Sequence, residues 1–96
     1  MNEVHMFRIN LDAPWDVGDA GEILDATPPE IIADMFALAH DHMHGVYAAA
    51  RKHDRRRPWR WHRIPKLRKC EKHNCRELAR RLRLVREVYQ AREDQG

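Results

Sequence analysis

Apolar positions recur with helical spacing in the first half of the chain. The stretch Thr27-Pro28-Pro29-Glu30 predicts a helix start, with Thr27 as the N-cap, a proline at the first helical position and Glu30 closing a capping box. The pattern predicts a long helix over 28–53. The residues expected to face inward are Ile31, Ile32, Met35, Leu38, Ala39, His42, Val46 and Ala49. Among them we expect His42 to be a core histidine whose hydrogen-bonding groups are satisfied.

A second apolar stripe predicts a helix over 75–93. Leu78, Leu82, Val85 and Tyr89 are spaced by four, three and four residues, and Asn74 precedes them as a plausible cap. Glu77 and Arg81 stand four residues apart, as do Arg83 and Glu87, a spacing that supports one unbroken helix through ion pairs. We expect the two long amphipathic helices to face each other and form the core.

The amino-terminal part has a different pattern. Residues 4–11 alternate between apolar and polar positions, which predicts a strand or an extended arm. Residues 12–26 contain Pro14, two glycines and five carboxylates, so we expect an acidic loop. Because Pro58 and Pro65 should interrupt helix, 55–73 is expected to be a basic connector.

These elements predict a mainly α fold in one small domain over 1–96. It comprises an arm and acidic loop (1–26), a helix (28–53), the connector (55–73) and a helix (75–93). The only other alternating stretch lies near residues 59–64. The alternative is therefore an α+β fold with a minimal two-stranded sheet that pairs 4–11 with 58–64.

Charge divides the chain into two halves. Residues 1–50 contain nine acids and one base, whereas residues 51–96 contain seventeen Lys and Arg against six acids. The segment RRRPWRWHRIPKLRK, residues 55–69, combines eight bases with two tryptophans. Such segregation favours contact with a polyanion on the basic side, with the acidic half either covering the basic half or offering a second surface.

The basic half predicts a nucleic-acid-associated binding protein. Guanidinium and ammonium groups neutralise phosphates, and tryptophan rings stack on unpaired bases. Two alternatives are that these cations pair with the acidic half, or that they dock on an acidic protein. The predicted contact residues are Arg55, Arg56, Arg57, Trp59, Arg60, Trp61, Arg63, Lys66, Arg68 and Lys69, extended by Arg76, Arg80 and Arg83 on the last helix.

The acidic half supports a second functional hypothesis. In this hypothesis the protein is a small inhibitor or regulator of the phage-antagonist type, which docks on a larger nucleic-acid-handling protein. The carboxylates around Trp15 would then imitate nucleic acid. A third hypothesis is a homodimer in which the basic segment of one chain pairs with the acidic loop of the other. The acidic surface would comprise Asp12, Asp16, Asp19, Glu22 and Asp25.

Histidines and cysteines offer one metal hypothesis. His40 and His44 share a helix face, and Cys70 and Cys75 stand before and at the start of the last helix, so the four would supply a zinc tetrahedron. The spacing matches no common zinc module, and we favour unligated side chains and no cofactor over a structural zinc.

Other chemistry is poorly provided for. The chain has no serine, one threonine and four glycines that form no phosphate-binding loop, so we predict no enzymatic activity. It also has no apolar run long enough to cross a membrane and no signal-peptide core. We therefore expect a cytoplasmic protein with no membrane contact and with reduced cysteines.

Overall fold

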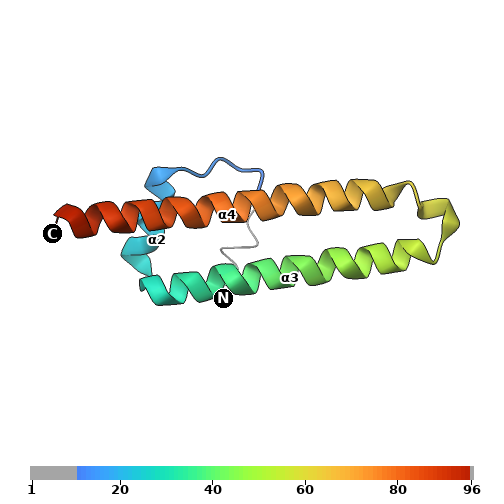
Figure 1. Cartoon of the computed structure of the whole chain (residues 1–96), viewed down its shortest axis with the longest axis horizontal. Coiled ribbons are helices and arrows are strands. Elements are labelled where there is room, and N and C mark those ends of the chain that lie inside the picture. Colours follow the sequence, from blue (N-terminus) through green and yellow to red (C-terminus); the bar gives the residue numbers. More distant parts are fainter. Residues whose placement is uncertain (1–10, 96) are drawn as a thin grey trace.

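Two long antiparallel helices and one short helix make up most of the molecule (Figure 1). The computed structural model describes residues 11–95: α2 (Val17–Ala26), α3 (Pro29–Arg55), the 3₁₀ turn η1 (Pro58–Arg60) and α4 (Arg63–Gln95). Helices α3 and α4 form a hairpin, and α2 packs across its open end against both. The result is a rod of 58 × 22 × 17 Å. A mainly α fold is thus confirmed.

Helix α2 corrects the prediction of an acidic loop over 12–26. Asp16 adopts extended backbone angles and its carboxylate accepts a hydrogen bond from the Gly18 N–H at 3.0 Å. The Asp19 carboxylate in turn accepts from the Asp16 N–H at 2.8 Å. This reciprocal capping satisfies donors that a helix start leaves unpaired, so carboxylates that are typical of a loop instead begin a helix.

Replacing Asp16 with alanine is expected to destabilise the protein by about 0.5–2 kcal/mol, because the cap is lost while the helix residues stay the same. Urea denaturation followed by circular dichroism measures this, with an unchanged m-value. Asp16→Asn is the control, because asparagine also caps and should retain most of the stability. Equal losses in both variants would show that the carboxylate acts through its charge rather than as a cap.

The start of α3 differs from the predicted capping box by one residue. Thr27 has extended angles and ends α2, whereas Pro28 is the residue before the helix and makes no side-chain cap. The residue before a proline is pushed out of the helical region, so Pro29 forces Pro28 to stay extended (φ −60°, ψ 142°). The helix therefore begins at Pro29, and Thr27 and Glu30 form no capping box.

The described connection between the long helices contains no strand. The alternative two-stranded sheet is therefore wrong for residues 58–64, the half of it that the structure describes. Residues 58–60 form η1, and α4 already begins at Arg63. Residues 4–10, the other predicted strand, lie outside the described residues. Pro65 does not interrupt helix because it occupies the first turn of α4, where its missing N–H has no helical partner to bond. Most of the predicted connector is therefore helical.

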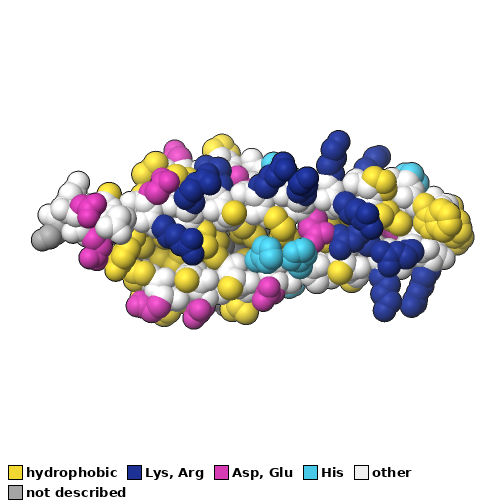
Figure 2. All heavy atoms as spheres, in the orientation of Figure 1, with side chains coloured by type: hydrophobic (Ala, Val, Ile, Leu, Met, Phe, Trp, Pro, Cys, Tyr) yellow, Lys and Arg dark blue, Asp and Glu magenta, His cyan; other side chains and the backbone are white. Residues whose placement is uncertain are grey.

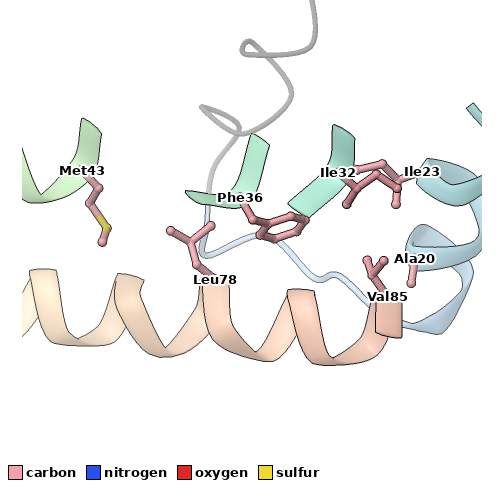
Figure 3. Packing of buried hydrophobic residues seen from close by; sticks show 7 residues of the cluster. All are labelled: Ala20, Ile23, Ile32, Phe36, Met43, Leu78 and Val85. Atoms are coloured by element: carbon pink, nitrogen blue, oxygen red, sulfur yellow. The ribbon is translucent and has the colours of Figure 1, made fainter. Parts of the chain in front are cut away.

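The apolar core lies in the half of the hairpin that α2 covers. Figure 3 shows the Phe36 ring between α3 and α4, close to Leu78, while residues from α2 face Ile32 and Val85. The buried cluster comprises Ala20, Ile23, Ile32, Phe36, Met43, Leu78 and Val85. Among the described residues, no apolar side chain is fully buried between Met43 and Leu78. The hairpin's closed end is therefore held by other means.

The buried stripe of α3 is rotated from the predicted one. Ile31, Leu38 and Val46 are 46%, 62% and 52% exposed, and His42 is also exposed rather than a core histidine. Phe36 and Met43 are buried in their place. Ile32, Met35 and partly buried Ala39 belong to both stripes, so the sequence pattern alone does not distinguish them.

Candidate functional site

The closed end of the hairpin carries the strongest charge. We call residues 51–72 the hairpin end: they comprise the last turn of α3, the connection and the first turns of α4, with eleven Lys and Arg and two acids. Figure 2 shows Lys and Arg gathered densely over this half of the face drawn, and most Asp and Glu at the other half. The hairpin end is therefore cationic, whereas the acids of α2 and of the first half of α3 lie toward the open end, together with the remaining arginines of α4.

Asp54 organises the connection. Its carboxylate is nearly buried, at 4% exposure, and accepts a hydrogen bond from Arg60 Nε at 3.0 Å, with Arg63 Nε at 3.6 Å. The Trp61 indole N–H donates to the Arg55 carbonyl at 2.9 Å. Arg57 donates to the His53 carbonyl at 2.9 Å. These bonds give the connection a defined shape, and they engage three arginines that the sequence assigned to partner contact.

The remaining hairpin-end cations project outward. Within the part of the chain that the structure describes, they are exposed and their side chains make no hydrogen bond or ion pair. Trp59 and Trp61 are also exposed, by 72% and 54%. The sequence prediction missed Lys52 and Lys72, which flank the basic run and join it only through the helical geometry. These outward cations are Lys52, Arg55, Arg56, Lys66, Arg68, Lys69 and Lys72.

The predicted extension along α4 is only partly available. Arg76 and Arg83 are exposed. Arg80, in contrast, donates two hydrogen bonds to the Glu77 carboxylate, at 2.7 and 3.0 Å, and one to the Trp15 carbonyl at 2.8 Å. Arg80 is therefore a structural residue that fastens the segment before α2 to α4.

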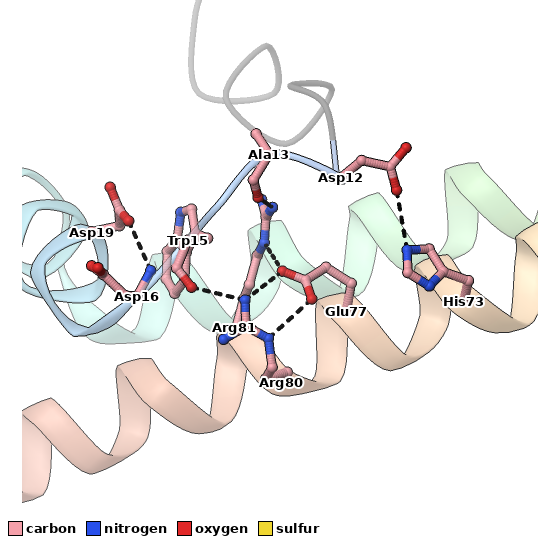
Figure 4. Close-up of polar contacts among 9 residues, drawn as sticks. All are labelled: Asp12, Ala13, Trp15, Asp16, Asp19, His73, Glu77, Arg80 and Arg81. Carbon is pink, nitrogen blue, oxygen red and sulfur yellow. Dashed lines mark hydrogen bonds and ion pairs between the residues drawn. The ribbon is translucent and has the colours of Figure 1, made fainter.

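The Arg80–Glu77 pair belongs to a partly buried polar cluster (Figure 4). Arg81, only 6% exposed, donates to Glu77 at 2.8 Å, and its guanidinium lies 5.4 Å from the Trp15 ring centroid. This confirms the predicted pairing of Glu77 with Arg81, whereas the predicted pair of Arg83 with Glu87 is not formed among the described residues. The pKa of Glu77 is lowered to about 2, although partial burial acts to raise it. The largest cause is the hydrogen bonding from Arg80, and the hydrogen bond from Arg81 contributes less.

Most residues of the predicted acidic surface cap a helix or form an ion pair within the protein. Asp16 and Asp19 cap α2, Asp12 pairs with His73 at 3.1 Å, and Asp25 pairs with Arg92 at 2.8 Å. Glu22 is exposed on α2. Because α2 lies at the open end, the hairpin-end arginines Arg60 and Arg63 are paired with Asp54 rather than with α2.

Three of the four predicted metal ligands come together. His40, His44 and Cys75 place one potential ligand atom each within 4.8 Å of the others, whereas Cys70 is exposed and lies outside the group. The Cys75 sulfur is 3.7 Å from His40 Nε2, and the two imidazole rings meet edge to face at 4.7 Å. Both cysteines are free thiols. Burial, and then the charge of Glu71, raises the pKa of the Cys75 thiol.

Glu71 connects this group to the basic end. Its nearly buried carboxylate contacts His44 Nδ1 with one oxygen and Arg51 with the other. The hydrogen bond from Arg51 is the main reason that the pKa of Glu71 is lowered. Beside it, an open hollow of about 550 Å³ is lined by His44, Arg51, Arg55, Arg68, Glu71, Lys72 and Cys75.

Comparison of the chain with protein-family models, with curated proteins and with solved structures finds no match. None of the helices within 11–95 combines the length and the apolar character that crossing a bilayer requires.

Proposed function

We propose that the protein binds nucleic acid through the hairpin end as a non-enzymatic, regulatory partner. The observation that carries the proposal is the group of seven outward cations around two exposed tryptophans. The acids within the hairpin end, Asp54 and Glu71, are both buried and already paired with arginines. The outward surface of this end is therefore cationic.

The geometry suits a phosphate backbone better than a single small anion. Outward cations come from both helices, so they surround the connection instead of converging on one point. Neutralising successive phosphates releases counterions and makes binding depend steeply on salt. Trp59, 72% exposed beside these cations, is available to stack on an unpaired base.

Removing two outward arginines is expected to weaken binding to all sequences alike. We expect Arg55→Ala/Arg56→Ala to reduce the slope of log K against log salt by about 1–2, because each lost phosphate contact removes nearly one counterion. Tryptophan fluorescence titrations with single- and double-stranded oligonucleotides, from about 50 to 300 mM salt, measure this slope. Quenching by single strands would report stacking.

The control is Arg86→Ala/Arg92→Ala, which removes the same charge from exposed positions of α4 that lie outside the hairpin end and outside the predicted contact residues. It should leave the slope nearly unchanged. Equal effects of the two double variants would indicate general charge attraction, and absence of binding at low salt would reject the proposal. In that case Glu22 is the position to reverse in a search for a protein partner, because Asp16 and Asp19 are needed to cap α2.

A further inference from the structure

The His40, His44 and Cys75 group lies where the apolar core ends. Met43 and Leu78 are the last buried apolar residues of α3 and α4 toward the hairpin end. Beyond them Tyr47 and Cys75 pack against the edge of the core, and hydrogen bonds and ion pairs also join the two helices. They include the Asn74 amide donating to the Tyr47 hydroxyl at 2.9 Å and the pairing of Arg51 with Glu71. A bond between α3 and α4 at this point would hold together the part of the hairpin that has little apolar burial.

The spacing of the side chains fits two facing helices. His40 and His44 are four residues apart on α3, and Glu71 and Cys75 are four residues apart on α4. Residues at this spacing lie on one helix face, one turn apart. The antiparallel hairpin brings the two pairs against each other, with Cys75 beside His40 and Glu71 beside His44.

The distances are close to those of a metal centre. A tetrahedral zinc ion, with bonds of about 2.3 Å to sulfur and 2.0–2.1 Å to nitrogen, holds these two ligand atoms roughly 3.6 Å apart. The Cys75 sulfur and His40 Nε2 are 3.7 Å apart. The three ligand atoms lie within 4.8 Å of one another, so only a small adjustment of the side chains is needed to bring all three to one ion.

We propose that His40, His44 and Cys75 bind one Zn²⁺ ion that clamps α3 to α4, with water in the fourth position. Two imidazoles and one thiolate favour zinc over the hard cations Mg²⁺ and Ca²⁺, which prefer oxygen ligands. The site is half open to solvent, because His44 is exposed and His40 and Cys75 are partly buried. Solvent therefore reaches the fourth position.

Glu71 acts as a positioning residue for His44. Metal-bound histidines usually donate their second ring N–H to a carboxylate, which fixes the ring and its tautomer. The Glu71 carboxylate contacts His44 Nδ1, which leaves His44 Nε2 for the ion, and Arg51 holds the other carboxylate oxygen. Arg51 thus holds Glu71, and Glu71 in turn orients the His44 imidazole toward the ion.

The full-length protein, freed of metal with a chelator and then dialysed, should take up about one equivalent of Zn²⁺ in calorimetric titration. Cys75→Ala and His40→Ala are expected to abolish this uptake. The matched controls are Cys70→Ala and His42→Ala, exposed residues of the same two types on the same two helices, which should bind zinc like the unaltered protein. Glu71→Gln should weaken affinity by about 10–100-fold without changing the stoichiometry.

Cobalt gives a second readout that depends on the ligands. Co²⁺ bound at this site should show a thiolate-to-metal charge-transfer band that Cys75→Ala removes and Cys70→Ala retains. Circular dichroism of each variant checks that the helices are intact. No zinc uptake by the folded, reduced protein, or equal losses with the Cys75 and Cys70 variants, would overturn the proposal. Its outcome is independent of nucleic-acid binding, which the Arg55/Arg56 variant tests.

Discussion

Replacing Glu77 with glutamine is expected to lower the free energy of unfolding by about 3–5 kcal/mol, the cost of leaving a buried charge without its partner. Glu77 accepts three hydrogen bonds from Arg80 and Arg81, and Arg81 is only 6% exposed. A domain of this size has only a few kcal/mol of stability to lose, so we expect the variant to be largely unfolded at room temperature. Urea denaturation followed by circular dichroism measures the difference.

The same cluster predicts how stability depends on acid. The pKa of Glu77 is about 2 in the folded protein, below the value of about 4.3 in an unfolded chain. Its contribution, roughly 2–3 kcal/mol, is therefore complete above about pH 5.5 and is lost as the pH falls from about 5 toward 2. The difference in stability between the unaltered protein and Glu77→Gln should narrow over that range.

Glu87→Gln is the matched control, because Glu87 is an exposed glutamate of the same helix. Within the described residues it makes no ion pair, so its replacement should change stability by less than about 0.5 kcal/mol. If Glu77→Gln proves as mild as Glu87→Gln, the cluster is dispensable and α2 is held by apolar contacts alone.

Replacing Phe36 with alanine is expected to cost about 3–5 kcal/mol, because a buried aromatic ring is lost and a cavity remains. Phe36 is 3% exposed and belongs to the cluster in which α2, α3 and α4 meet. The loss should therefore melt the whole domain in one transition rather than release α2 alone. Thermal and urea denaturation measure it, followed by far-ultraviolet circular dichroism and by tryptophan fluorescence in a Trp59→Phe/Trp61→Phe background, in which Trp15 is the remaining tryptophan.

Leu38→Ala provides the comparison, since Leu38 lies two residues away on the same helix but is 62% exposed. We expect a change within about 0.5 kcal/mol. The pair of variants also distinguishes the two possible apolar stripes of α3. A large loss with Leu38→Ala and a small one with Phe36→Ala would restore the stripe that sequence spacing predicts.

The sequence was sufficient to predict the long helices, because helical periodicity and Pro29 near the start are local signals. It misplaced their boundaries and the buried face for a different reason. Ile32, Met35 and Ala39 fit two overlapping stripes, and only the positions of α2 and α4 decide between them. Asp16 and Asp19 indicated a loop by composition, although their reciprocal hydrogen bonds begin α2.

The candidate sites show the same division between local and tertiary information. The run of bases around Trp59 and Trp61 is visible in the sequence, but the engagement of Arg60 and Arg63 by Asp54 is a tertiary contact. The i, i+4 spacing of His40 and His44 predicted a shared face. That Cys75 rather than Cys70 meets them depends on the register of the hairpin, which no local pattern fixes.

The separation of charge along the 58 Å rod makes the protein a strong electric dipole. In the field of a polyanion such a charge distribution is subject to a torque as well as an attraction, so the proposed binding to nucleic acid would begin at the hairpin end. In that complex the acid-rich end with α2 would be repelled and would point away from the polymer. Each bound copy would therefore have its long axis pointing away from the polymer. It would cover a short length of the polymer and hold helix α2 at the far end of the rod.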